Sequence, residues 1–411
     1  MDFIDQFMAY TEDVTSPEIF RLWSGIMLVA GALERRVWVK VSSRVSYPNL
    51  FVLLVAPPGV GKLIIDEVRE LWRDARQPGV NLPAFHVAPD SMTKASLIDS
   101  IASATVVFTP KEDKPLKYHS LLVAAEEFSV LLPAYDMEYI GVLNSIWSNK
   151  PVHEETRRHG PARDIKIENP TLNMFGGCQP AWLAALFPEE AWSTGLARRL
   201  VMIYSTDTPY RSMFYEGEID EGARERVVER LGQFSKMYGQ MKWEREAQEM
   251  YEKWDLSGTP NLGGAPVPSH TKLQHYNKSR RYFAFKLCII SSASRGNDMV
   301  IRAGDVDRAL GWMLDAERAM PDIFRAMLGK SDKDVIDEMH TYVMGKFGMH
   351  RNPVDIQDIR RFMLERVPHD KVEGIIKSAE NANLISRVAG TGTDEKPAQY
   401  VPKARLNYAP E

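Results

Sequence analysis

Apolar residues recur at helical spacing over residues 20–33, directly after the run Thr15-Ser16-Pro17. A hydroxyl residue followed by proline is typical of a helix start, and the charged run Glu34-Arg35-Arg36 ends the pattern. We therefore expect an amphipathic N-terminal helix. Residues 37–41 then alternate between apolar and polar side chains, which predicts a half-exposed strand.

A continuous apolar run, Leu50–Val55, predicts a strand that is covered on both faces and lies at the centre of a sheet. Helical patterns separate most of the remaining strand candidates, and this alternation is typical of an α/β domain. The remaining buried-strand candidates are Ala84–Val87, Thr105–Phe108, Ser120–Ala124, Leu172–Gly176 and Leu200–Tyr204.

The pattern beyond residue 216 is mostly helical, with a Gly- and Pro-rich interruption at 256–269 that predicts an exposed loop. After residue 330, three helical patterns and two strand patterns follow one another, as in a winged helix. The helical patterns cover 333–346, 355–366 and 369–382, and the strand patterns cover 384–388 and 399–403. We divide the chain into an N-terminal helical segment (1–45), an α/β core (46–215), a helical region (216–330) and a winged-helix domain (331–411).

The composition of the 411 residues, 44% hydrophobic and 26% charged, is that of a folded chain with sizeable cores. The net charge of -4 gives no overall attraction to nucleic acid, so any such contact needs a local patch. Cys178 and Cys288 are far apart and have no His or Cys neighbours at ligand spacing, which argues against a disulfide framework and a zinc site. The apolar run Ile26–Leu33 is too short to span a bilayer. We expect a cytoplasmic protein without a membrane partner.

The segment Ala56–Leu63 joins the predicted central strand to an apolar helical pattern. Small residues in such a turn let backbone N–H groups approach a phosphate, and the helix N-terminus and Lys62 favour the anion. Ala56 replaces the usual first Gly, and Leu63 replaces the Ser or Thr whose hydroxyl binds magnesium, so water would have to fill that position. A structural Gly-Pro turn is the alternative. The candidate nucleotide-binding residues are Pro58, Gly59, Val60, Gly61, Lys62 and Leu63.

An acid pair, Glu126-Glu127, follows the apolar strand pattern at 120–124. In this position one carboxylate, Glu126, would lie beside a metal-bound water and the next near an attacking water. A solvated strand edge is the alternative for the pair.

Polar residues also accompany the next two strands. Gln179 and Asn173 are candidates for contact with a γ-phosphate or the attacking water, with turn amides as the alternative. Arg198 and Arg199 precede the strand pattern at 200–204 and could stabilise charge on the γ-phosphate of a neighbouring subunit. A surface salt bridge is the alternative for these arginines.

Taken in order, five segments across nearly half of the chain resemble the ATPase core of phage and prophage replication proteins, related to primase-helicases and to AAA+ or RecA-like ring helicases. The resemblance implies a P-loop NTPase core that uses ATP and Mg²⁺ and assembles as a ring, such as a hexamer. It also implies that Lys62 binds phosphate, that Glu126 and Glu127 form the second acidic motif, and that Arg199 is an arginine finger. Leu63 departs from the family's Ser or Thr, which affects hydrolysis more than nucleotide binding. The segments are Tyr47–Leu50, Ala88–Ile98, Ala125–Leu132, Asn169–Met174 and Gly195–Arg199.

Basic residues gather at 150–166, between the acid pair and the following strand. A hairpin at this point lines the channel of ring helicases and holds single-stranded DNA by its phosphates. A solvated charged loop is the alternative. The winged-helix region has 12 Lys plus Arg against 13 Asp plus Glu, so its binding to protein is at least as well supported as its binding to DNA. The candidate DNA-binding residues are Arg157, Arg158, Arg163 and Lys166.

The leading expectation is an oligomeric P-loop ATPase that acts on single-stranded DNA in phage-type replication as a helicase or translocase. A nucleotide-binding adaptor or loader that hydrolyses ATP weakly and recruits other replication proteins is the main alternative, favoured by Leu63. A transcriptional regulator that uses its winged helix is less compatible with the charge of that region.

Overall fold

The chain folds into two compact units, residues 1–327 and 328–411, in the computed structural model. Each unit has its own hydrophobic core. The structure describes residues 2–41, 44–110, 114–132, 136–156, 164–187, 192, 195–210, 220, 222–258, 264–327, 332–364, 367, 369–392 and 396–403.

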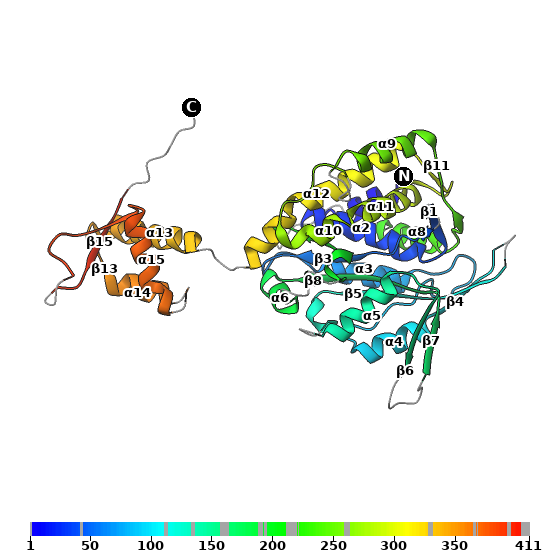
Figure 1. The fold of residues 1–411 in the computed structure, drawn as a ribbon, viewed down its shortest axis with the longest axis horizontal. Helices are drawn as coiled ribbons and strands as arrows, with labels where there is room; N and C mark the ends of the chain where they lie inside the picture. Colours follow the sequence, from blue (N-terminus) through cyan, green and yellow to red (C-terminus); the bar gives the residue numbers. More distant parts are fainter. Residues whose placement is uncertain are drawn as a thin grey trace. The chain divides into compact units, whose positions relative to one another are not determined.

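The first unit is built around a central sheet in which four strands run parallel (Figure 1). The strand order is β4-β5-β8-β3-β9, and β4 pairs antiparallel with β5 at one edge. Because parallel strands end on the same side, the segments that follow β3, β5, β8 and β9 meet at one edge of the sheet. The strands are β3 (Phe51–Val55), β4 (Thr105–Phe108), β5 (Leu116–Ala125), β8 (Pro170–Cys178) and β9 (Leu200–Tyr204).

The strand predictions for this sheet are mostly confirmed. β3 is buried along its whole length because it lies between β8 and β9, as its continuous apolar run predicted. The strands predicted after residue 119 are confirmed as parts of β5, β8 and β9. Two predictions were wrong in part. β4 forms but is half-exposed because it is an edge strand, and Ala84–Val87 makes only a single bridge, between Val87 and Leu122.

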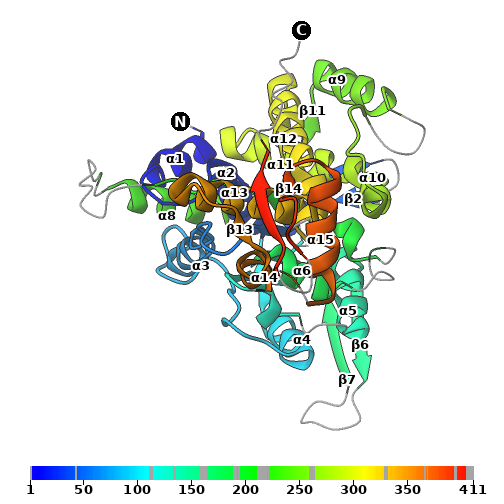
Figure 2. The same cartoon turned by 90° about the vertical axis from the view of Figure 1, so that its left-hand side faces the viewer.

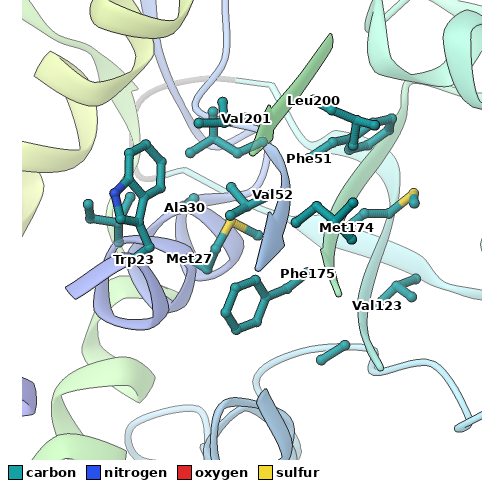
Figure 3. Packing of buried hydrophobic residues seen from close by; sticks show 14 of the residues in the cluster. Trp23, Met27, Ala30, Phe51, Val52, Val123, Met174, Phe175, Leu200 and Val201 are labelled. Atoms are coloured by element: carbon teal, nitrogen blue, oxygen red, sulfur yellow. The ribbon is translucent and has the colours of Figure 1, made fainter. Parts of the chain in front are cut away.

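Helix α2 (Glu18–Leu33) packs on β8 and β9 and alongside α3 (Ile64–Asp74). In Figure 3, Met27 and Ala30 of α2 face the buried side chains of the sheet. The helix predicted over residues 20–33 is confirmed, but its predicted amphipathic character is wrong, because every residue from Trp23 to Leu33 is buried. Helices α1 (Phe3–Tyr10), α8 (Ala223–Phe234) and α11 (Arg280–Arg295) also pack against α2, which is therefore part of the core.

The remaining elements of the first unit include a protruding hairpin of β6 and β7, two small sheets and the helices predicted after residue 216. The prediction of a half-exposed strand at residues 37–41 is confirmed in β1. The remaining strands are β1 (Val37–Val41), β2 (Arg44–Ser46), β6 (Val152–Thr156), β7 (Asp164–Glu168), β10 (Gly239–Gln240), β11 (Lys242–Trp243) and β12 (Val300–Ile301). The remaining helices are α4 (Lys94–Ser103), α5 (Met137–Trp147), α6 (Pro180–Leu186), α8 (Ala223–Phe234), α9 (Arg245–Leu256), α10 (Gln274–Asn277), α11 (Arg280–Arg295) and α12 (Ala303–Met327), with short 3-10 turns at Phe128–Val130, Ala197–Arg199 (η2) and Thr271–Leu273.

The second unit contains three helices and a three-stranded sheet of order β13-β15-β14. The three helices and the β14–β15 hairpin lie where the sequence pattern predicted them. Strand β13, which has only two residues, was not predicted, because two residues carry no periodic signal. The elements are α13 (Asp332–His350), β13 (Val354–Asp355), α14 (Ile356–Leu364), α15 (His369–Asn381), β14 (Ile385–Arg387) and β15 (Gln399–Pro402).

Candidate functional site

The ends of β3, β5 and β8 meet around Gly177, near the end of β8. A Cβ atom at Gly177 would lie only 2.1 Å from the carbonyl oxygen of Glu126, which follows β5. It would also lie 3.0 Å from Cδ of Lys62, which follows β3. Glycine is required here because the backbone of one strand end and the lysine chain of another approach within contact distance. The structure therefore brings together the predicted phosphate loop and the predicted acid pair.

The loop between β3 and α3 is supported by the residues that precede α2. The hydroxyl of Ser16 donates to the carbonyl of Gly61 at 2.6 Å. A Cβ atom at Gly61 would lie 1.9 Å from the carbonyl oxygen of Thr15, so no larger residue fits. Gly59 has a φ of 84° and open space around it, as a turn at the loop surface requires. The support by Thr15 and Ser16 was not predicted, because the two residues carried only a helix-start signal.

Lys62 lies in the position that the sequence predicted for a phosphate ligand. Its side chain is largely buried and makes no hydrogen bond or ion pair with any residue that the structure describes. The next residue, Leu63, is 62% exposed and precedes the N-terminus of α3 without a side-chain cap. An ammonium group that has no partner among the described residues and lies just before a helix N-terminus is suited to an anion.

The acid pair lies at the end of β5, as predicted. Glu126 is exposed, and Glu127 is half-buried and accepts a hydrogen bond from the Ser129 hydroxyl at 3.4 Å. Burial, together with the charge of Glu127, raises the pKa of the Cys178 thiol to about 12, while the positive charge of Lys62 acts in the opposite direction. Glu127 and Lys62 are therefore both close enough to Cys178 to influence it.

A preformed metal cluster is not visible in the described part of the chain, where no three His, Cys, Asp or Glu side chains gather around one point. Magnesium in nucleotide sites is usually held by one or two carboxylates, waters and the substrate phosphates, so the prediction for Glu126 does not require such a cluster. Glu126 stays a predicted ligand, exposed at the correct strand end.

Gln179 and Asn173 differ in their position relative to β8. Gln179 directly follows the strand, at the edge where Cys178 accepts a hydrogen bond from the N–H of Ala56 in the phosphate loop. Asn173 lies within the strand, fully buried, and its Oδ1 accepts a hydrogen bond from the N–H of Leu50 at 2.9 Å. The structure therefore does not bring Asn173 to the edge where the phosphate loop and the acid pair lie.

The two arginines before β9 lie in η2 and differ in their surroundings. Arg199 is half-buried and donates to Asn144 Oδ1 at 3.0 Å and to the Ser148 hydroxyl at 3.3 Å. Burial, followed by the nearby charge of Arg198, lowers the pKa of Arg199 to about 10. Arg198 is exposed and has no hydrogen bond or ion pair with residues that the structure describes. Arg198 is therefore the arginine whose guanidinium group is available to a partner.

Of the four predicted DNA-binding residues, the structure describes only Lys166. Arg157, Arg158 and Arg163 fall outside the described residues. Lys166 is exposed on β7 and pairs in register with Glu154 of β6. Lys166 therefore stays a candidate on an accessible strand.

A buried polar network occupies the edge of the sheet opposite the phosphate loop. Nζ of Lys286, on α11, donates to the backbone and side-chain oxygens of Asn49, each at 2.6 Å, and lies 4.4 Å from the ring centre of Trp147. Lys286 is fully enclosed, and burial lowers its pKa to about 7. This network gives Asn49, which precedes β3, a structural role.

The buried ammonium group predicts that stability rises with pH. Above about pH 7 the folded protein releases the Lys286 proton, whereas the unfolded chain retains it up to the ordinary lysine pKa. The free energy of unfolding should therefore increase by up to about 1.4 kcal/mol per pH unit between pH 7 and 9. Lys286→Met should abolish this increase in urea unfolding, and Lys40→Met, on the exposed part of β1, should preserve it. If the free energy of unfolding changed with pH in the same way in wild type and Lys286→Met, the Asn49 oxygens would be keeping Lys286 protonated in the folded protein.

Neither a protein-family model nor a curated protein matches this chain, so its function is argued from the site. None of the helices within the described residues is both long and apolar enough to cross a membrane.

Proposed function

We propose that this protein is an oligomeric P-loop ATPase that acts on single-stranded DNA, as a helicase or translocase of phage-type replication. The observation that carries the proposal is the meeting of Lys62, Glu126, Glu127 and Gln179 at the carboxyl edge of one parallel sheet. In α/β sheets ligands bind at this edge, and phosphoryl transfer needs these groups: a lysine for the phosphates, an acid for the metal and a polar group for the attacking water.

The topology supports the same conclusion. The strand followed by the phosphate loop lies next to the strand that ends in Gln179, and the strand that ends in the acid pair is one place further out. This arrangement fits the AAA+ and RecA-like cores that the sequence resembles. Magnesium, when bound, would neutralise charge on the β- and γ-phosphates, and Glu126 would hold it through a bound water. A second water would take the position of the missing hydroxyl at Leu63.

The second unit fits a winged helix, with α15 as the helix that would read DNA. Its exposed charges alternate in sign: Lys371 and Lys377 carry positive charge, and Glu373 carries negative charge. Arg360, on α14, forms an ion pair with Glu373 at 2.7 Å, which further reduces the positive charge available to phosphates. A protein partner in replication is therefore better supported for this unit than duplex DNA.

A second function, a nucleotide-binding adaptor or loader with weak hydrolysis, is favoured by one observation. Leu63 is exposed at the position where a hydroxyl would bind magnesium. An apolar side chain there affects turnover and leaves the phosphate contacts of Lys62 in place.

Turnover of ATP by the full chain with magnesium, with and without single-stranded DNA, tests the proposal. We expect hydrolysis that DNA stimulates and that is absent from Lys62→Ala. ATP binding without hydrolysis would favour the adaptor. No ATP binding at all would contradict both functions and reduce the loop at 56–63 to a structural turn.

A further inference from the structure

The C-terminal end of α5 holds the guanidinium group of Arg199. Besides the hydrogen bonds to Asn144 and Ser148, Cζ of Arg199 lies 5.2 Å from the ring centre of Trp147, the last residue of the helix. Hydrogen bonds and cation–π contact thus join η2 to one helix end. The same contacts hold the backbone of η2, from which the exposed Arg198 extends.

The same helix end forms the base of the β6–β7 hairpin. Ser145 Oγ and His153 Nδ1 of β6 lie 3.4 Å apart, within hydrogen-bond distance. The N–H of Asn169, directly after β7, donates to the carbonyl of Pro151, directly before β6, at 2.6 Å. Figures 1 and 2 both show β6 and β7 extending away from the central sheet, and β7 also packs on α4 and β5. The end of α5 is therefore one of the supports of the hairpin base.

The end of α5 is in turn fixed to the core of the unit. The carbonyl of Trp147 accepts hydrogen bonds from the side-chain amides of Asn49 and Asn149, both at 3.2 Å. Lys286 lies against the same indole ring as Arg199, so two cations contact Trp147. These contacts make η2, the end of α5 and the hairpin base one connected part of the subunit.

We infer that Arg199 is a positioning residue that couples Arg198 to the β6–β7 hairpin. This inference rests on the proposed function, an oligomeric ATPase that acts on single-stranded DNA. It takes Arg198 as the arginine offered to the nucleotide of a neighbouring subunit and the hairpin as the contact with DNA. A displacement of the hairpin base by bound DNA would be transmitted through α5 and Arg199 to Arg198. DNA would thereby stimulate ATP turnover at the neighbouring site.

The test compares the ratio of ATP turnover with and without single-stranded DNA in full-length variants. Arg199→Ala and Asn144→Ala each remove one side of the connection, and the double variant should be no worse than either single variant. Arg199→Lys keeps the positive charge and much of the packing but loses the planar fork of donors, so it tests the geometry in a less disruptive way. Arg230→Ala is the matched control, because Arg230 is also half-buried, lies 5.0 Å from the Phe234 ring and has a pKa lowered by burial.

We expect the ratio of turnover with and without DNA to fall close to one in the Arg199 and Asn144 variants. Arg230→Ala should keep the wild-type ratio. A wild-type ratio in Arg199→Ala and Arg199→Lys would overturn the inference, and equal losses with and without DNA would also overturn it by making Arg199 part of the reaction. Wild-type protein that hydrolyses no ATP would instead contradict the proposed function, a result visible before any variant is made.

Discussion

Replacing Lys62 with alanine should lower the affinity for ATP by about two orders of magnitude or more, because a hydrogen bond between charged groups contributes about 1.5–3 kcal/mol and the triphosphate offers several acceptors. Lys62 makes no hydrogen bond or ion pair with other described residues, so its removal should cost the fold little. Binding of a fluorescent ATP analogue at equilibrium measures the effect directly.

The carbon chain of Lys62 passes close to Gly177, so the alanine variant also changes packing. Lys62→Met keeps that chain and removes only the charge, and it should lose affinity to the same degree. Lys94→Ala, which removes a surface ion pair between Lys94 of α4 and Glu138 of α5, should bind ATP normally. Unchanged affinity in Lys62→Met, measured beside an intact thermal unfolding curve, would rule out the loop as a phosphate site.

Local signals in the sequence were sufficient to predict the parts of the site that follow strands. The apolar runs before Lys62 and Glu126 identify β3 and β5, and a strand that ends in small or charged residues indicates the functional edge of a sheet. The two glycines near the end of β8 were misleading, since glycine weakens the interior of a strand. They lie inside the strand because the backbone of Glu126 and the chain of Lys62 approach one of them, Gly177.

Contacts between distant segments could not be predicted. The hydrogen bond between Ser16 and Gly61 joins residues 45 positions apart, and that between Arg199 and Asn144 joins residues 55 positions apart. The three helices that enclose α2 come from other parts of the chain and could not be named in advance, although the nearly unbroken apolar run from Trp23 to Leu33 indicated burial. The resemblance in motif order implied that Arg199 is the arginine finger. The structure separates the two arginines by their surroundings, since Arg199 is hydrogen-bonded to Asn144 and Ser148 whereas Arg198 is exposed.

Arg198→Ala should leave ATP binding intact and lower turnover by roughly 10³-fold or more, the effect of removing an arginine finger. The binding should survive because η2 lies at the edge of the sheet opposite the phosphate loop, where β9 begins. The nucleotide bound by the same chain is therefore out of reach of Arg198, and the effect on turnover requires a second subunit. Steady-state hydrolysis together with ATP affinity separates this outcome from a loss of binding.

The decisive measurement is a mixture of two inactive variants. Lys62→Ala cannot bind ATP but still presents Arg198, whereas Arg198→Ala binds ATP but presents no arginine. If the arginine acts between subunits, mixed rings contain sites with an intact phosphate loop from one chain and an intact Arg198 from the next, so activity should return on mixing. If Arg198 acted within its own chain, every site in the mixture would lack one group and no activity would appear. A mixture of Arg198→Lys with Lys62→Ala is the control for assembly, because the lysine keeps the positive charge at the subunit boundary. Any ATP turnover that this mixture recovers would depend on Arg198 of the Lys62→Ala chain alone.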